Sequence, residues 1–210
     1  LIFMTDNGTA GGTFNYNMKG RKNSPHEGGS RVPLFMRLPN EIKAGVDVDR
    51  LTRHYDLFPT LAEMAGASIP KDLDLDGRSL LPLIGNPQAT WDDRTTFFHL
   101  GRWNKAGVDG IWGEGNTDPD KAKYTGFAVR NEKWRLVGDS LYNIEKDPGE
   151  TKDRAQDYPE VVSEMRKSFD VWWDEVRPLM VNEDASLDTG KPFVIQFEKQ
   201  QQDSGIPDWI

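Results

Sequence analysis

The sequence predicts an α/β fold: one end of a doubly wound sheet, followed by a small subdomain in which a helix covers an antiparallel sheet. Apolar runs at residues 1–4 and 32–36 indicate strands, and a helical pattern follows the second run. Short β-rich segments between residues 124 and 144 indicate the antiparallel sheet. An apolar stripe at helical spacing, over about residues 159–177, predicts the helix that covers it.

The first run, Leu1–Met4, is apolar on both faces and ends at the polar segment Thr5–Gly8. A strand of this kind belongs in the middle of a parallel sheet covered by helices, with further strands on either side. We therefore expect the chain to be a fragment of a larger α/β enzyme. Residues 8–29 are rich in glycine and lack periodicity, which predicts a long loop of the kind that is usually functional or mobile.

The second run, Val32–Met36, has Pro33 near its beginning, where proline suits a strand. Asp56 can cap the next helix, and Gly66 can end it. One face of that helix is expected to carry an apolar stripe made of Leu57, Leu61 and Met64.

The pattern changes near residue 90, so we expect residues 1–90 to form one part and residues 91–210 a second subdomain. In the second part the sequence predicts a strand over residues 95–100, a hairpin over 124–137 and a third strand over 141–144. Proline brackets the covering helix, whose apolar face consists of Val161, Met165, Phe169, Trp172 and Val176. Residues 192–210 are expected to pack as an extended tail.

Composition narrows the classes of function that are open to this chain. The 210 residues include 26 Lys and Arg against 34 Asp and Glu, a formal net charge of −8, so nucleic acid is not an expected partner. No apolar run approaches the roughly 18 residues of a membrane span. The absence of cysteine excludes disulfides, thiolate metal sites and a Cys nucleophile in this chain. A small anionic substrate remains compatible with a local cationic pocket.

Two oxygen-bearing side chains, Asp6 and Asn7, directly follow the first strand. Ligands of open α/β sheets gather beyond the carboxyl ends of the strands, and a carboxylate with an amide carbonyl suits a hard cation such as Ca²⁺ or Mg²⁺. The alternative is a simple turn, because Asn-Gly is a strong turn signal.

A second candidate lies in the loop, where Lys22 and His26 precede the pair Gly28–Gly29. Cationic side chains beside glycines that allow close backbone approach can hold an oxyanion. The alternative is that Lys22 is a solvated side chain of a polar loop, which is the commoner case for lysine.

In combination these segments resemble the sulfatase family, within the alkaline-phosphatase-like superfamily, over nearly the whole chain as the C-terminal part of such an enzyme. Thr5–Gly8 is similar to the family's late metal-binding motif, and Lys22 lies five residues before Glu27, as the family's sulfate-binding lysine does. Further segments that resemble the family in the same order are Arg31–Pro33, Asp56–Leu61, Ala65–Gly66, Asp76–Leu80, Trp134–Leu136, Leu141–Ile144 and Asp147–Glu150.

The resemblance implies hydrolysis of a sulfate ester by a formylglycine hydrate, made from a Cys or Ser in an activation motif that is absent from this chain. It implies that Asp6 and Asn7 are two ligands of a divalent cation, usually Ca²⁺, completed by the N-terminal remainder of the sulfatase. Lys22 would bind the sulfate as a catalytic residue. The resemblance also implies a periplasmic or secreted location and an inactive isolated chain.

Substrate choice is assigned to His99 and Arg102, which stand beside Trp103 near a second glycine-rich loop. A guanidinium suits anionic groups and an indole stacks on apolar sugar faces, so these residues can bind a sulfated carbohydrate. The alternative is a strand end whose Trp is in the core and whose His and Arg face water. A phosphoester or phosphonate hydrolase of the same superfamily, and a noncatalytic carbohydrate-binding chain, remain the other functional hypotheses.

Overall fold

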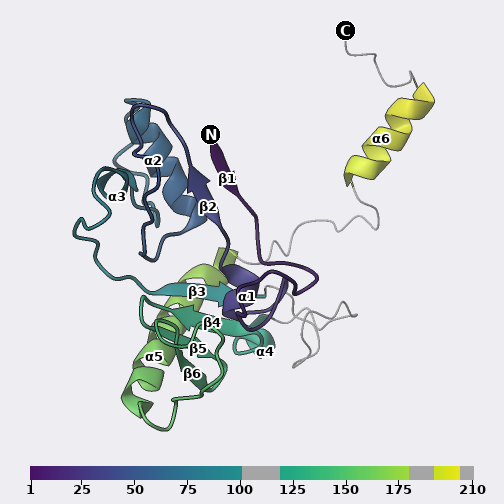
Figure 1. Ribbon diagram of the computed structural model, residues 1–210. Helices are drawn as coiled ribbons and strands as arrows, with labels where there is room; N and C mark the ends of the chain where they lie inside the picture. Colours follow the sequence, from purple (N-terminus) through teal and green to yellow (C-terminus); the bar gives the residue numbers. More distant parts are fainter. Residues whose placement is uncertain (101–118, 180–191, 204–210) are drawn as a thin grey trace. The chain divides into compact units, whose positions relative to one another are not determined.

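The computed structural model describes residues 1–100, 119–179 and 192–203 (Figure 1). The chain divides into two compact units, Leu1–Glu175 and Val176–Ile210. The predicted boundary near residue 90 stays a prediction. Within the described residues, no helix combines the length and the apolar character that a membrane span needs.

The first sheet has two strands, β1 (Ile2–Met4) and β2 (Leu34–Met36), which pair antiparallel. This antiparallel pairing differs from the parallel neighbours expected of β1, and the one helix between the two strands, the four-residue α1 (Glu27–Ser30), is too short for a parallel crossover. Phe3 lies opposite Phe35, with ring centroids 6.1 Å apart. Both rings are more than half exposed, at 56% and 64%, so one face of this sheet has no cover among the described residues.

Next along the chain come the short helix η1 (His54–Asp56), helix α2 (Leu57–Met64) and helix α3 (Leu81–Gly85). The Asp56 side chain makes no capping hydrogen bond to α2, contrary to the prediction. It is fully buried, accepts hydrogen bonds from the backbone amides of Arg53 and Arg78 at 2.6 and 2.9 Å, and forms an ion pair with Arg94. The Asp56 carboxylate thus caps the preceding turn η1 through the Arg53 amide and pairs with Arg94 over a long range, but it does not cap α2.

The apolar residues expected to form the buried stripe of α2 are in part exposed. Leu61 and Met64 are 47% and 37% exposed, whereas Pro59 and Thr60 are the buried residues of the helix. The Thr60 hydroxyl donates to the Asp56 carbonyl oxygen at 2.6 Å and accepts from the Leu80 amide at 2.8 Å. This helix therefore uses a polar contact for docking and leaves its leucine face open among the described residues.

The second sheet is an antiparallel meander in the order β3 (Thr96–His99), β4 (Phe127–Arg130), β5 (Trp134–Val137), β6 (Ser140–Asn143), and the short helix α4 (Pro119–Ala122) precedes β4. These strands lie where the sequence predicts them, within one or two residues. Side chains alternate between the two faces, so strand register decides what each face presents.

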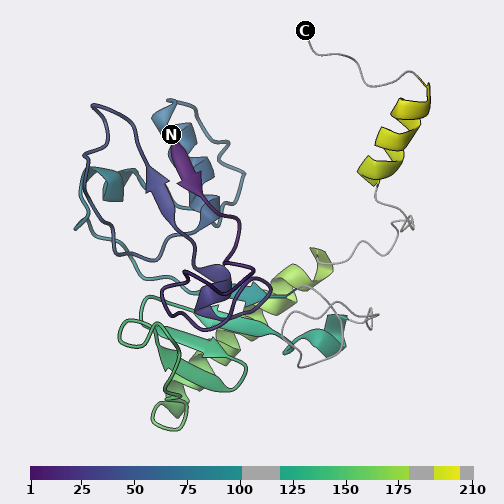
Figure 2. The same cartoon turned by 45° about the vertical axis from the view of Figure 1, so that its right-hand side comes forward.

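Helix α5 (Pro159–Val176) covers one face of this sheet, and the segment that includes the short helix α1 (Glu27–Ser30) lies over the other (Figures 1 and 2). Phe169 of α5 is fully buried, with its ring 4.5 Å from that of Phe127. Trp172 stacks on Phe97 at 5.1 Å, but the buried tryptophan of α5 is Trp173, which the predicted stripe did not include.

The second unit contains the end of α5, the short helix η2 (Arg177–Leu179) and helix α6 (Pro192–Asp203). The prediction of an extended tail is wrong for residues 192–203, which are helical. A run of long polar side chains such as Gln200–Gln202 is compatible with a helix because these residues lose little rotamer freedom there. Residues 204–210 lie outside the described part of the chain.

Candidate functional site

The Asp6–Asn7 pair follows β1 after a single residue, Thr5, close to where the sequence predicts it. The Asp6 side chain is exposed and Asn7 is half-buried, and the Thr5 hydroxyl donates to the Asn7 carbonyl oxygen at 3.1 Å. No group of three or more His, Cys, Asp or Glu is placed to hold a metal ion within residues 1–100, 119–179 and 192–203. The donor chemistry of Asp6 and Asn7 fits a hard cation, but two side chains supply only part of the six to eight oxygens that Ca²⁺ takes.

Main-chain bonds tie the loop that carries Lys22 to the residues that directly follow this pair. The Lys22 amide donates to the Thr9 carbonyl oxygen at 3.0 Å, and the Gly8 amide donates to the Gly29 carbonyl oxygen at 3.0 Å. The two segments therefore run side by side, with Lys22 bonded two residues beyond Asn7. The Lys22 side chain is exposed, and its ammonium has no hydrogen-bond or ion-pair partner in the part of the chain that the structure describes.

Glycines make this close approach possible. A Cβ atom on Gly8 would lie 1.9 Å from the Gly28 carbonyl oxygen, and one on Gly28 would lie 2.6 Å from the Gly20 carbonyl oxygen. A Cβ on Gly29 would lie 2.2 Å from the Ser24 carbonyl oxygen. All three obstacles are backbone atoms, so any side chain at these positions would force the segments apart.

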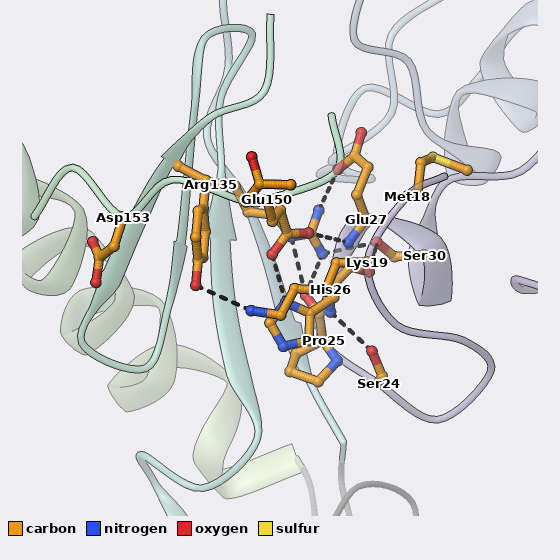
Figure 3. Close-up of polar contacts among 12 residues, drawn as sticks. Met18, Lys19, Ser24, Pro25, His26, Glu27, Ser30, Arg135, Glu150 and Asp153 are labelled. Atoms are coloured by element: carbon orange, nitrogen blue, oxygen red, sulfur yellow. Dashed lines mark hydrogen bonds and ion pairs between the residues drawn. The ribbon is translucent and has the colours of Figure 1, made fainter. Parts of the chain in front are cut away.

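Charged residues of the second sheet bind the loop after Lys22. Strand register places Arg130, Arg135 and Tyr142 in one row across β4, β5 and β6, on the sheet face that α1 covers. Arg135 donates to Glu27 Oε2 at 2.7 Å and to Ser30 Oγ at 2.8 Å, and it also donates to the Pro25 carbonyl oxygen (Figure 3). Its guanidinium is 1% exposed, so these are buried, charge-assisted hydrogen bonds.

The Glu27 carboxylate also forms an ion pair with a second arginine: the Nε atom of Arg130 lies 3.5 Å from Glu27 Oε2. Burial lowers the pKa of Arg135, and the neighbouring Glu27 and Glu150 carboxylates oppose that shift. Burial likewise lowers the pKa of Arg130, opposed by Glu27. A guanidinium remains charged in proteins in spite of such shifts, so Glu27 neutralises charges that are already buried.

A carboxylate from the turn after β6 completes the network. Glu150 is 3% exposed, and one of its oxygens lies 2.5 Å from His26 Nδ1 (Figure 3). Its other oxygen accepts the Glu27 backbone amide at 2.6 Å. Lys19 adds a contact from the same loop, with its Nζ atom 3.2 Å from the Tyr142 hydroxyl. The loop that carries Lys22 is thus attached to the second sheet at several points.

The predicted substrate residues lie elsewhere. His99 ends β3, is half-buried, and its Nε2 atom lies 3.0 Å from the Ala122 carbonyl oxygen. Its ring centroid is 4.8 Å from that of Trp173, and burial lowers the pKa of His99, opposed by the bond to Ala122. Arg102 and Trp103 lie outside the described residues. The substrate-binding role of His99 and Arg102 stays a prediction.

Sequence analysis did not single out Arg130, Arg135 or Glu150 as members of the site. A signal for the two arginines was present, because both stand inside predicted strands of a hairpin, where a charge without a partner is costly. Glu150 carried no such signal, since acidic residues are common in turns.

Solved structures identify the class of this fold. Ps i-CgsB in complex with k-i-k-neocarrahexaose aligns with a TM-score of 0.65 and 24% identity, over 97% of this chain and 41% of that chain. BT4656 in complex with its substrate D-glucosamine-2-N,6-O-disulfate aligns with a TM-score of 0.55 and 18% identity, over 87% of this chain and 35% of that chain. The fold is the alkaline-phosphatase-like α/β fold of the sulfatases.

Within this class, the profile of the family "N-sulphoglucosamine sulphohydrolase, C-terminal" matches residues 21–173, so the chain belongs to this sulfatase family. The human steryl-sulfatase is 38% identical over 100 residues, which are 45% of this chain and 17% of that protein. The alignment therefore spans less than a fifth of this relative's length.

Proposed function

We propose that this chain is the C-terminal part of a sulfatase that hydrolyses sulfate esters of a carbohydrate. Membership of the sulfatase family supports the reaction class. The disulfated glucosamine substrate of BT4656 favours a carbohydrate sulfate, although that likeness is one of fold. The proposal places the formylglycine nucleophile and the remaining metal ligands in the N-terminal remainder of the enzyme, so the 210-residue chain alone should not turn over an aryl sulfate.

The observation that supports the proposal is the 3.0 Å bond from the Lys22 amide to the carbonyl oxygen of Thr9, which lies two residues beyond Asn7. A side-chain carboxylate, an amide oxygen and an ammonium that has no partner among the described residues would together form one half of a site for a tetrahedral anion. Asp6 and Asn7 would hold a divalent cation, Ca²⁺ or Mg²⁺. Bound there, the cation would polarise oxygens of the sulfate.

Lys22 would act on the sulfate group. Its ammonium would bind a sulfate or bridging oxygen and offset the negative charge that develops as the sulfur–oxygen bond of the ester breaks. A positioned charge of this kind is typically worth about 3 kcal/mol in the transition state, or roughly two orders of magnitude in rate. Lys22→Arg should restore little of the lost rate, because a planar guanidinium cannot place its charge where a compact ammonium stood.

The test uses the full-length protein that contains this chain, with kcat/KM measured on one aryl sulfate and several sulfated sugars. Lys22→Ala should lower kcat/KM about a hundredfold on all of them, because the charge acts on the sulfate that every substrate shares. Lys43→Ala is the matched control, since Lys43 is also exposed and partnerless among the described residues. An unchanged rate for Lys22→Ala, or faster turnover of the matching aryl phosphate, would contradict the proposal.

A further inference from the structure

Glu150 stands in an unusual place for a turn residue. It closes the turn Asp147–Glu150, where its amide donates to the Asp147 carbonyl oxygen at 3.0 Å. Its φ angle is +51°, in the left-handed region that residues other than glycine seldom adopt. Most glutamates in turns are solvated, yet this carboxylate is 3% exposed. The turn thus holds a buried charge at its end.

Both oxygens of that carboxylate contact the loop after Lys22. One contacts His26 Nδ1 at 2.5 Å, and the other accepts the Glu27 amide at 2.6 Å. These two residues follow Lys22 by four and five positions. Arg135 Nε lies 3.9 Å from the same carboxylate, so a cation compensates part of its charge. A two-pronged contact of this kind fixes both the position and the direction of the main chain.

The turn is held firmly enough to serve as an anchor. The Asp147 carboxylate accepts the backbone amides of Thr151 and Lys152, each at 2.8 Å. The turn also touches the opposite end of the loop, because a Cβ atom on Gly149 would lie 3.1 Å from the Asn17 carbonyl oxygen. The loop from Asn17 to Glu27 is therefore contacted near both ends by one turn.

Among the described residues, no side chain supports Lys22 in the same way. Its side chain is exposed, and its amide bond to Thr9 is a contact within the same loop. The location of the ammonium therefore depends on where the loop is attached. We propose that Glu150 is a positioning residue for Lys22: by binding His26 and Glu27 it fixes the loop whose Lys22 amide is bonded to Thr9, two residues beyond Asn7, and so sets where the ammonium stands. This inference rests on the proposed sulfatase function.

The test compares Glu150→Ala and Glu150→Gln in the full-length protein, with Asp56→Asn as the matched control. Asp56 is also a buried carboxylate that accepts two backbone amides and pairs with an arginine, but its hydrogen-bond and ion-pair partners, Arg53, Arg78 and Arg94, lie outside residues 17–30. Its replacement reports the general effect of disturbing a buried ion pair. The readouts are kcat and KM on an aryl sulfate, and amide hydrogen exchange of residues 17–30.

Glu150→Ala should lower kcat about tenfold or more with a smaller change in KM, because misplacing a catalytic group by about 1 Å can cost about a hundredfold in rate. Exchange of residues 17–30 should accelerate in the same variant. Glu150→Gln keeps the length of the side chain and one acceptor oxygen, so both effects should be intermediate. Asp56→Asn should lower stability and change neither readout of the folded protein.

Two results would overturn the inference: unchanged exchange of residues 17–30 in both Glu150 variants, or the same loss of kcat in Asp56→Asn. If Glu150→Ala does not fold, Glu150→Gln decides, since exchange and kcat that match wild type would refute the role. A wild-type protein that turns over no sulfate ester would refute the proposed function. The exchange data would then still show whether Glu150 positions the loop.

Discussion

Replacing Arg135 tests the buried network that attaches the loop to the second sheet. Arg135→Met keeps much of the side-chain volume and the apolar stem but removes the guanidinium. The Glu27 carboxylate then loses its 2.7 Å partner, and the Pro25 carbonyl oxygen loses its donor. The contact of the guanidinium with the Phe98 ring, 4.6 Å from its centroid, is also lost. Arg130 and Arg31, at 3.5 and 3.8 Å from Glu27, remain.

The expected cost follows from these contacts. Removing one partner of a buried ion pair costs about 3–5 kcal/mol, and the two remaining arginines favour the lower end of that range. An unpaired buried carbonyl adds about 1 kcal/mol. We therefore expect Arg135→Met to lower the free energy of unfolding by about 4 kcal/mol, a large part of the roughly 5–15 kcal/mol of a typical domain.

Urea denaturation of the purified protein measures this change. With an m-value of about 2 kcal/mol/M, the midpoint should fall by about 2 M. The double variant Glu27→Leu with Arg135→Met should be destabilised by less than the sum of its two single variants, because each single variant leaves one member of the same buried ion pair without its partner. Arg37→Met, at an exposed arginine, should leave the midpoint nearly unchanged. A loss below about 1 kcal/mol for Arg135→Met, or purely additive effects in the cycle, would refute the reasoning.

Three further predictions concern the site and the turn. In the full-length protein, Asp6→Ala should weaken Ca²⁺ binding more than Asn7→Ala, because it removes a charged ligand; wild-type affinity in both variants by calorimetric titration would make this pair a turn. His99→Ala should change the ranking of carbohydrate sulfates while sparing a small aryl sulfate in kcat/KM measurements, and a total loss of aryl sulfate turnover would reverse its role. Partial burial opposes ionisation of Asp147, but bonds from the Lys152 and Thr151 amides lower its pKa below the ordinary 3.8. Its contribution to stability should therefore be fully present above about pH 5 and be lost as pH falls through the lowered pKa. If acidification lowers the urea midpoint by the same amount in Asp147→Asn as in the wild type, this prediction is contradicted.

Periodicity predicted the second sheet and its cover because these elements are local. Alternating apolar residues define each strand, and the spacing of Met165 and Phe169 defines one face of α5. The pairing of β1 with β2 was harder to predict, since the direction in which two strands pair depends on the path of the chain between them. Leu1–Met4 has the composition of a central parallel strand, yet it pairs antiparallel with β2 and leaves Phe3 exposed. The apolar composition of this segment indicates a strand buried on both faces, whereas the described residues leave one of its faces uncovered.

The polar networks could not be predicted in the same way. Asp56 has the residue type and position of a helix cap, but its partner Arg94 stands 38 residues away. His26 and Glu150 are 124 residues apart, and nothing near either residue in sequence indicates the other. Local propensity describes what a side chain can do, whereas the fold decides which distant partner it meets. The sequence therefore could not show whether the loop that carries Lys22 is solvated or attached to the second sheet, and the structure was needed to decide between the two.

The contribution of this network to stability and its contribution to geometry are different questions. A buried ion pair often adds little net stability compared with apolar residues of equal volume, because desolvation offsets the attraction. An apolar contact would not fix the orientation of the loop on the sheet, because it is not directional. Arg135 presents its donors in a fixed planar fork, and it binds the Pro25 carbonyl oxygen and Glu27 together. Such a fork accepts one register of the loop on the sheet, and a one-residue slip would leave buried charges unpaired. The second sheet would thereby set where Lys22 stands, although it contributes no group to the proposed sulfate site.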